Sequence, residues 1–188
     1  MKLSEVDSEQ KPRGKKLSEI LQEENNRLNL AKKDEQILVN KIIERDRKNG
    51  WYKEVEPVVT KIDSVISEEN LAKKNGFSYQ RFLVRDFDTP EDEEFLKMKN
   101  FIKNFPQDQK LYVHCAGGKG RTGMFLILLD IAKNGKNVSL EEIFARQHSL
   151  GAARLDEISQ EESWNEEIAK KRLEMIKNFY QSQVGLEK

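Results

Sequence analysis

The chain has 188 residues, enough for one domain with a sizeable hydrophobic core, and 35% of them are charged. Its 33 lysines and arginines balance 33 aspartates and glutamates, which argues against a dedicated nucleic-acid binder, because such proteins are usually basic. A single cysteine cannot form an internal disulfide, and the longest apolar run, residues 124–129, is far too short to span a membrane.

The N-terminal segment is polar. Residues 1–15 are predicted to form a flexible lead-in, and they lack the apolar core of a signal peptide. As written, the chain is therefore expected in the cytoplasm, and export stays open for the case of an N-terminally truncated form.

The first regular elements are a helix and a pair of strands. An apolar stripe predicts a helix over residues 18–30. Residues 37–43 and 56–66 are rich in β-branched side chains, and the Asn-Gly pair at 49–50 suits a tight turn between them. These features predict two strands, with a helix over 36–46 as the alternative.

The middle of the chain alternates helix and strand signals. A Ser-x-x-Asn start and a closing glycine predict a short helix over 67–76, and residues 79–87 resemble a strand. The sequence Thr89-Pro90-Glu91-Asp92 resembles a capping box with proline in the first turn. We expect a helix from there to Phe105.

The C-terminal part begins with a short apolar strand at 110–114. A buried helix is expected to follow and to end at Gly135, and Ser139 is expected to cap another helix through Gln147. A long final helix is predicted from about Ser159, with an apolar stripe that includes Trp164, Ile168, Leu173, Ile176 and Phe179.

The stretch HCAGGKGRTG, residues 114–123, joins the strand to the buried helix. Backbone N–H groups at a helix start have no intrahelical partner, and glycines let a loop direct several of them at one anion. Arg121, six residues after Cys115, can grip two phosphate oxygens at once. The same positive surroundings favour a thiolate, so the loop predicts a nucleophile in position to attack phosphorus.

Three other interpretations of this stretch are weaker. A lone cysteine is most often a small buried hydrophobe, but the arginine and glycines at this spacing disfavour that. Gly118, Gly120 and Gly123 match a dinucleotide-binding fingerprint, yet no second strand with an acidic end follows the helix. A Walker loop would require Gly-Lys-Ser/Thr at the end of the motif, which is missing here.

HCAGGKGRTG also fits the H-C-x5-R-S/T signature of the protein tyrosine phosphatase superfamily. The surrounding sequence resembles the bacterial PTP-like phytases, which dephosphorylate inositol phosphates. The stretches that carry this resemblance are GKKLSEILQEENNRL, VVTKIDSVISEENLAKKNGFSYQRF, NFPQDQKLYVHCAGGKGRTGMFLILLDIAKN, EEIFARQHSLGA and SWNEEIAKKRLEMIKNFY. Together they cover roughly residues 14–182.

The resemblance assigns roles to individual residues. Cys115 matches the family's nucleophile and Arg121 its phosphate-binding arginine, while Asp86, 29 residues before the cysteine, matches the general acid. Thr122 matches the hydroxyl that helps the thiolate leave, and His114 matches the residue that orders the loop beneath the sulfur.

The remaining loop residues are expected to bind substrate, with Lys119 either contacting additional phosphates or lying free in solvent. The substrate-binding set implied by the resemblance is Ala116, Gly117, Gly118, Lys119, Gly120 and Arg121. Asp88 is a second candidate for the acid, and Asp86 is preferred because it matches the family spacing. The resemblance implies no metal and no cofactor.

The implied fold is α/β: a protein tyrosine phosphatase-like core, with a parallel-rich sheet flanked by helices. We expect one catalytic domain over 16–188 with a small β insertion near 35–66. The family's upstream strand ending in Asp-Leu-Arg is not found in the sequence, so an N-terminal core strand is expected to be missing.

The expected activity is hydrolysis of phosphate monoesters through a phosphocysteine, with inositol polyphosphates such as phytate as substrate. A tyrosine or dual-specificity protein phosphatase, acting on phosphoproteins, is the alternative enzyme. A catalytically weak, phosphate-binding pseudo-phosphatase is the alternative outside catalysis, and the missing strand is the feature that favours it. No nucleic-acid partner and no membrane span are expected.

Overall fold

The structure is a computed structural model, and it describes residues 16–33, 36–44, 54–158 and 163–185. The chain divides into two compact units, Met1–Arg81 and Phe82–Lys188. Three predictions lie outside the described residues: the lead-in at 1–15, the turn at 49–50 and the start of the last helix at Ser159. The single domain expected over 16–188 stays a prediction.

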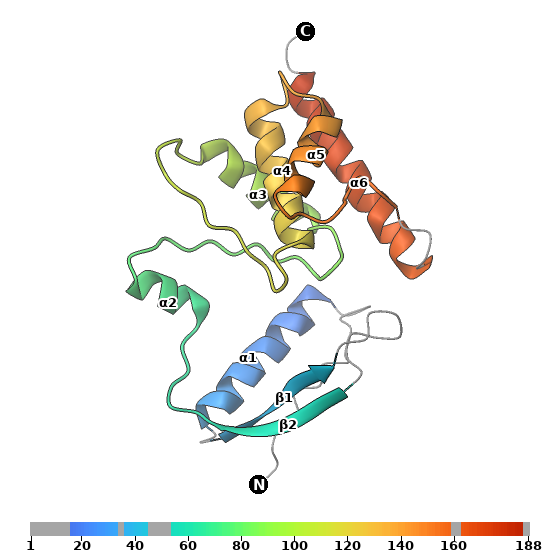
Figure 1. The fold of residues 1–188 in the computed structure, drawn as a ribbon. Coiled ribbons are helices and arrows are strands. Elements are labelled where there is room, and N and C mark those ends of the chain that lie inside the picture. The colour runs from blue at the N-terminus through green and yellow to red at the C-terminus, as the bar shows by residue number, and fades with distance from the viewer. Residues whose placement is uncertain (1–15, 34–35, 45–53, 159–162, 186–188) are drawn as a thin grey trace. The chain divides into compact units, whose positions relative to one another are not determined.

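The first unit holds a helix and two strands (Figure 1): α1 (Leu17–Lys33), β1 (Gln36–Glu44) and β2 (Glu54–Lys61). The strands pair antiparallel, with Val39 opposite Val58. The strand prediction is therefore confirmed and the helix alternative over 36–46 is wrong, because β-branched side chains favour a pleated surface.

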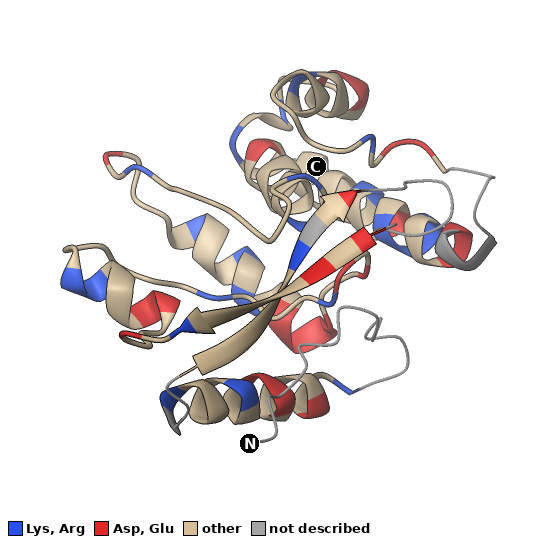
Figure 2. Ribbon diagram, turned by 60° about the horizontal axis from the view of Figure 1, so that its bottom comes forward, with Lys and Arg blue, Asp and Glu red and all other residues tan. Residues whose placement is uncertain are grey.

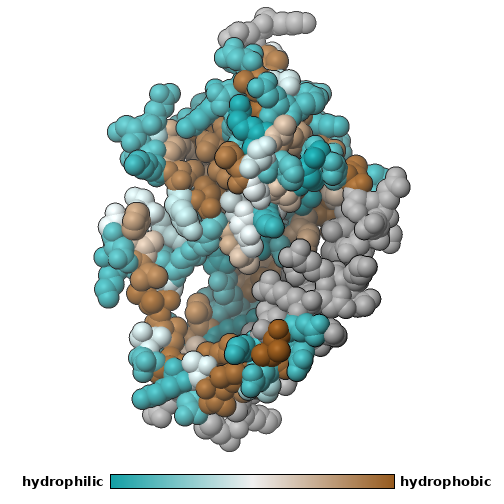
Figure 3. All heavy atoms as spheres, viewed as in Figure 1, coloured by the Kyte–Doolittle hydropathy of each residue, from teal (hydrophilic) through white to brown (hydrophobic). Residues whose placement is uncertain are grey.

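Much of the apolar surface of this strand pair is exposed. Figure 3 shows hydrophobic side chains at the surface of the first unit, and the exposed strand residues are Val39, Ile43, Val55, Val58 and Val59. A two-stranded sheet alone is marginally stable in water.

A short helix, α2 (Glu68–Lys74), completes the first unit. The Ser67 side chain accepts a hydrogen bond from the Asn70 amide, as the Ser-x-x-Asn pattern predicts. Gly76 follows the helix with a φ of 79°, a left-handed conformation that glycine adopts without strain.

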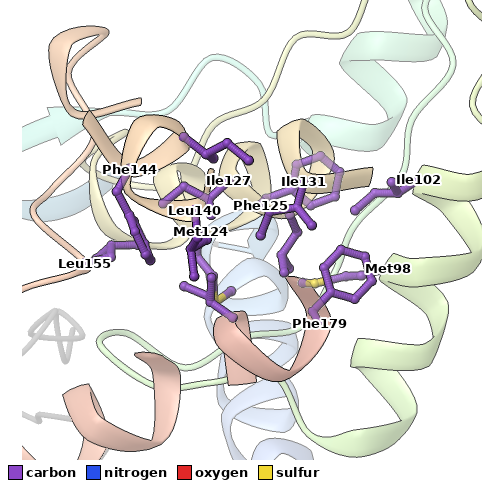
Figure 4. Packing of buried hydrophobic residues seen from close by; sticks show 13 residues of the cluster. Met98, Ile102, Met124, Phe125, Ile127, Ile131, Leu140, Phe144, Leu155 and Phe179 are labelled. Carbon is purple, nitrogen blue, oxygen red and sulfur yellow. The ribbon is translucent and has the colours of Figure 1, made fainter. Parts of the chain in front are cut away.

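The second unit is built around a buried helix. It contains α3 (Asp92–Asn104), α4 (Gly120–Asn134), α5 (Leu140–Ser149) and α6 (Ser163–Val184). Helix α4 packs against α3, α5 and α6. Side chains from all four helices point into one interior (Figure 4), where Met124, Ile127, Leu128, Ile131, Ile143 and Ile176 are almost fully buried. This core fixes α4, and so fixes the end of the loop that precedes it.

The helix ends follow local signals with one exception. Ser139 caps α5 by accepting a hydrogen bond from the Glu142 amide, and α4 ends at Gly135, both as predicted. The capping box at Thr89 is wrong, because α3 begins at Asp92 and its N-cap is Glu91. Thr89 lies before a proline, which disfavours helical backbone at that position.

The fold is mixed α/β, with six helices and a small sheet in the described residues. The strands predicted at 79–87 and 110–114 are wrong, since within the described residues only β1 and β2 form a sheet. Side chains take the place of a strand partner: the Leu83 amide donates to Glu94, and the Val84 carbonyl accepts from Arg121.

Acidic and basic side chains are interspersed along the helices of both units (Figure 2), in agreement with the balanced composition. Among the helices that the structure describes, none is long and apolar enough to cross a membrane. The upstream core strand that was expected to be missing is not tested by the described residues.

Candidate active site

The loop that contains the cysteine leads directly into α4. Gly118 adopts a φ of 68°, a left-handed conformation that lets the loop turn sharply. The N-cap residue is Lys119, and no side chain caps the helix. The first backbone N–H groups of α4 therefore remain available to an anion, with the positive end of the helix dipole behind them.

Cys115 is a half-buried free thiol with a perturbed pKa. Burial raises its pKa, but the Thr122 hydroxyl and the backbone amides of Thr122, Gly118 and Gly117 lower it more, and the pKa falls from 9.0 to about 7. These donors stabilise the thiolate more than the thiol. The thiol therefore ionises more readily near neutral pH than an ordinary cysteine does.

Thr122 belongs to the first turn of α4, and its hydroxyl oxygen is buried. This oxygen forms no hydrogen bond among the described residues, yet it lowers the pKa of the Cys115 thiol because it can donate to the ionised sulfur. Burying a hydroxyl without a partner costs free energy, and a hydrogen bond from this hydroxyl to the ionised sulfur offsets that cost.

Arg121 reaches from α4 to the segment that precedes α3. Its Nη2 lies 3.2 Å from Oδ1 of Asp86, and its Nη1 donates to the Val84 carbonyl at 3.4 Å. The Arg121 side chain is 27% exposed, and its Nε is buried without a partner among the described residues. The structure thus brings Asp86 and Arg121 together, although 35 positions separate them in the sequence.

The two candidate acids have different surroundings. Asp88 binds Arg85 at 3.0 Å through Oδ2 and accepts the Thr89 amide at 2.8 Å through Oδ1, so both of its oxygens hold the local backbone and side chains. Asp86 is 53% exposed and faces Arg121. Of the two carboxylates, Asp86 is the one that meets the arginine of the loop.

Two other predicted residues lie at the surface. His114 is exposed, and its ring centroid lies 5.6 Å from that of Tyr112. Lys119 is exposed as well, and its carbonyl accepts the Ala153 amide at 3.2 Å. That hydrogen bond ties the loop to the segment after α5.

Two charged residues that the sequence did not single out hold the segment around Asp86. Glu94, only 6% exposed, accepts the Leu83 amide at 3.0 Å. Arg172 donates from α6 to the Phe87 carbonyl at 3.2 Å. Glu94 lies one helical turn before the buried Met98, and Arg172 lies one turn before the buried Ile176. A charged residue on the apolar face of a helix is the sequence signal that would have pointed to both.

In the described part of the chain, the candidate site coincides neither with a group of metal ligands nor with the hollow along α6. Within the described ranges, no group of three or more His, Cys, Asp and Glu side chains is placed to hold a metal ion. A shallow hollow of about 320 Å³ lies elsewhere, along α6; it is lined by Ile158, Lys170, Leu173, Glu174, Lys177, Asn178 and Gln181. The candidate site is thus defined by its side chains and amides.

The family model PTPlike_phytase, described as "Inositol hexakisphosphate", matches residues 3–133, well over half of the chain. The chain belongs to the PTP-like phytase family. The resemblance inferred from the sequence is thereby confirmed.

Solved PTP-like phytases have the same fold. The tandemly repeated enzyme from Mitsuokella multacida is 31% identical, with a TM-score of 0.74 over 92% of this chain and 28% of its own. A PTP-like myo-inositol phosphatase from the same organism, in complex with myo-inositol-(1,3,4,5)-tetrakisphosphate, is 32% identical, with a TM-score of 0.73 over 91% of this chain and 28% of its own.

Part of the chain is also similar to a protein of Pseudomonas syringae pv. tomato. The effector protein hopD2 of Pseudomonas syringae pv. tomato is 32% identical over 88 residues, which are 46% of this chain and 19% of that protein. The chain therefore spans about a fifth of that relative's length and just over a quarter of the two solved chains.

Proposed function

We propose that the chain hydrolyses phosphate monoesters through a phosphocysteine, with inositol polyphosphates as its substrates. The observation that carries the proposal is the Cys115 thiol, because the Thr122 hydroxyl and the loop amides lower its pKa to about 7 and so make it a ready nucleophile. Family membership supports the same chemistry.

In the first step, the Cys115 sulfur attacks phosphorus in line with the leaving oxygen. The S–P bond forms as the P–O bond breaks, and protonated Asp86 donates its proton to the leaving alkoxide. Arg121 and the loop amides hold the three other phosphoryl oxygens. The proximity of Arg121 and Asp86 supports this division of roles, because acid and phosphate-binding group must flank one phosphorus.

In the second step, water attacks the phosphocysteine and inorganic phosphate leaves. Asp86, now ionised, accepts a proton from the attacking water, and the S–P bond breaks to regenerate the thiolate. The Thr122 hydroxyl and the loop amides stabilise that thiolate, as their effect on the Cys115 pKa supports. The proton balance is restored over the two steps without a metal ion.

The substrate proposal draws on the family and on Lys119. A similar myo-inositol phosphatase was solved with an inositol tetrakisphosphate. Lys119 is an exposed residue of the loop, and its side chain can contact a phosphate group other than the one being cleaved. A ligand with several phosphates gains from such a contact, whereas a monophosphate does not.

Phosphate release from inositol hexakisphosphate, measured with a metal chelator present, tests the proposal. We expect turnover by the native chain and none by Cys115→Ser, which should still bind inorganic phosphate through the loop amides and Arg121. A phosphotyrosine peptide tests the alternative enzyme, and its preferential turnover would contradict the inositol assignment. Phosphate binding without turnover of either substrate would indicate a pseudo-phosphatase.

A further inference from the structure

The turn that carries Asp86 has an unusual backbone. Phe87, the residue after Asp86, has a φ of 65°, and it is the one non-glycine residue with positive φ in the described part of the chain. A left-handed conformation at a bulky residue is strained, and it persists only where the surrounding structure holds it. Some contact must therefore stabilise this turn.

Arg172 of α6 makes such a contact, 85 residues further along the chain. Its Nη1 donates to the Phe87 carbonyl at 3.2 Å, in partly buried surroundings. Its Nε is buried and has no partner among the described residues. Burial lowers the pKa of this guanidinium, and the nearby Asp88 charge raises it only in part. Burying the positive charge of Arg172 at this position costs free energy, and the buried side chain donates a hydrogen bond to the strained turn.

Arg172 is anchored next to the hydrophobic core, whereas the Asp86 side chain is not. Arg172 lies one turn before Ile176, which is completely buried, and α6 packs against α4. Asp86, by contrast, is half exposed, and Arg121 is the charged partner it meets. A hydrogen bond from the rigid helix to the next residue's carbonyl restricts the direction in which the Asp86 side chain leaves the backbone.

We propose that Arg172 is a positioning residue for the general acid: it holds the Phe87 carbonyl and so aims the Asp86 carboxyl at the leaving oxygen. The inference rests on the proposed function, since it takes Asp86 as the acid. Arg172 acts through Asp86 in this scheme and does not touch substrate.

A leaving-group series tests this role without relying on the identity of the natural substrate. We compare kcat/KM for nitrophenyl phosphate, a good leaving group, with that for phenyl phosphate, a poor one that needs the proton. Asp86→Asn should lose ~10²–10⁴-fold on phenyl phosphate and much less on nitrophenyl phosphate. Arg172→Met should lose ~10–100-fold and ~3-fold or less on the same two substrates.

The double variant Asp86→Asn/Arg172→Met gives the decisive comparison. If Arg172 acts through Asp86, its removal should cost nothing further once the acid is gone. An equal loss on both substrates, or an additional loss in the Asp86→Asn background, would overturn the proposal in favour of direct substrate binding.

Two further variants control for folding. Lys171→Met removes an exposed charge from the adjacent position of α6 and should leave both rates unchanged. Arg172→Lys keeps a charged donor, and it should recover part of the phenyl phosphate activity. If the methionine variant does not fold, the lysine variant decides: a loss confined to phenyl phosphate supports the role, and a uniform loss refutes it.

Failure of this inference is distinguishable from failure of the proposed function. A native chain without turnover of nitrophenyl phosphate, or Cys115→Ser with full turnover, would refute the phosphocysteine mechanism itself. An active native chain whose Arg172 variants show no leaving-group dependence would refute only the positioning role.

Discussion

Arg121 and Asp86 lie in ion-pair contact, with Nη2 of the arginine 3.2 Å from Oδ1 of the aspartate. The proposed mechanism assigns the same guanidinium to the transferring phosphoryl group. A carboxylate and a phosphate therefore compete for one cation, and the outcome depends on which anion is closer and more highly charged.

The first prediction concerns this competition. Asp86→Asn removes the competing negative charge, so inorganic phosphate should bind several-fold more tightly, measured as its inhibition constant against nitrophenyl phosphate. Asp88→Asn is the matched control, because Asp88 is bound to Arg85 and should not affect the phosphate constant. A lower inhibition constant in the Asp88 variant alone would mean that the competing carboxylate has been misidentified.

The second prediction concerns the ionisation of Cys115. Because its pKa is lowered to about 7, the rate of alkylation by iodoacetamide should rise with pH, reach half its maximum near pH 7 and level off above that. Thr122→Val removes the hydroxyl that lowers the pKa, so its midpoint should move to higher pH. Thr122→Ser keeps the hydroxyl and should retain the native midpoint; identical curves for Val and Ser would exclude the hydroxyl as a cause.

The third prediction separates charge from geometry at Arg121. Lysine keeps the positive charge but lacks the planar fork whose two Nη atoms reach Asp86 and the Val84 carbonyl separately. Arg121→Lys should lower kcat/KM by ~10²-fold or more. Near-native kcat/KM in a folded lysine variant would show that a point charge is sufficient.

The sequence predicts the helices of this chain well because their signals are local. Ser67 and Ser139 cap the helices they precede, and the spacing from Cys115 to Arg121 identifies the loop. Strand formation at 79–87 could not be decided in this way. It depends on a distant partner, and in the structure Glu94 takes the amide that a neighbouring strand would have bonded.

The same distinction applies to the site. The residues between 114 and 122 are close in sequence, so their grouping follows from the loop alone. Asp86 was assigned to the site only through the family resemblance, and its contact with Arg121 follows from the structure alone. Arg172 contacts Phe87 across 85 positions, and no local pattern around either residue indicates that contact.

The fourth prediction concerns the packing behind the loop. A Cβ at Gly123 would lie 2.7 Å from the Ala152 Cβ, closer than side chains tolerate. Gly123→Ala should therefore destabilise the fold by about 1–3 kcal/mol in denaturant unfolding, although alanine is the better helix former. Gly120→Ala meets nothing within 4 Å and should be nearly neutral in stability. Ala152→Gly should relieve the clash in the double variant; if it does not, the packing argument fails.

The last prediction concerns Lys119 and the class of substrate. Lys119 is exposed and lies between Gly118 and Gly120, in the loop proposed to hold the phosphoryl group, so a substrate with several phosphates should be able to place a second one near it. The interaction is between solvent-exposed charges and should weaken as salt is added. Lys119→Ala should therefore raise KM for inositol hexakisphosphate more at low salt than at high salt, and should hardly change KM for nitrophenyl phosphate. Lys110→Ala, at another exposed lysine of the second unit, is the control for a general loss of positive charge. Equal effects of Lys119→Ala on both substrates would mean that this lysine does not recognise additional phosphates, and the inositol polyphosphate assignment would lose its support from the loop.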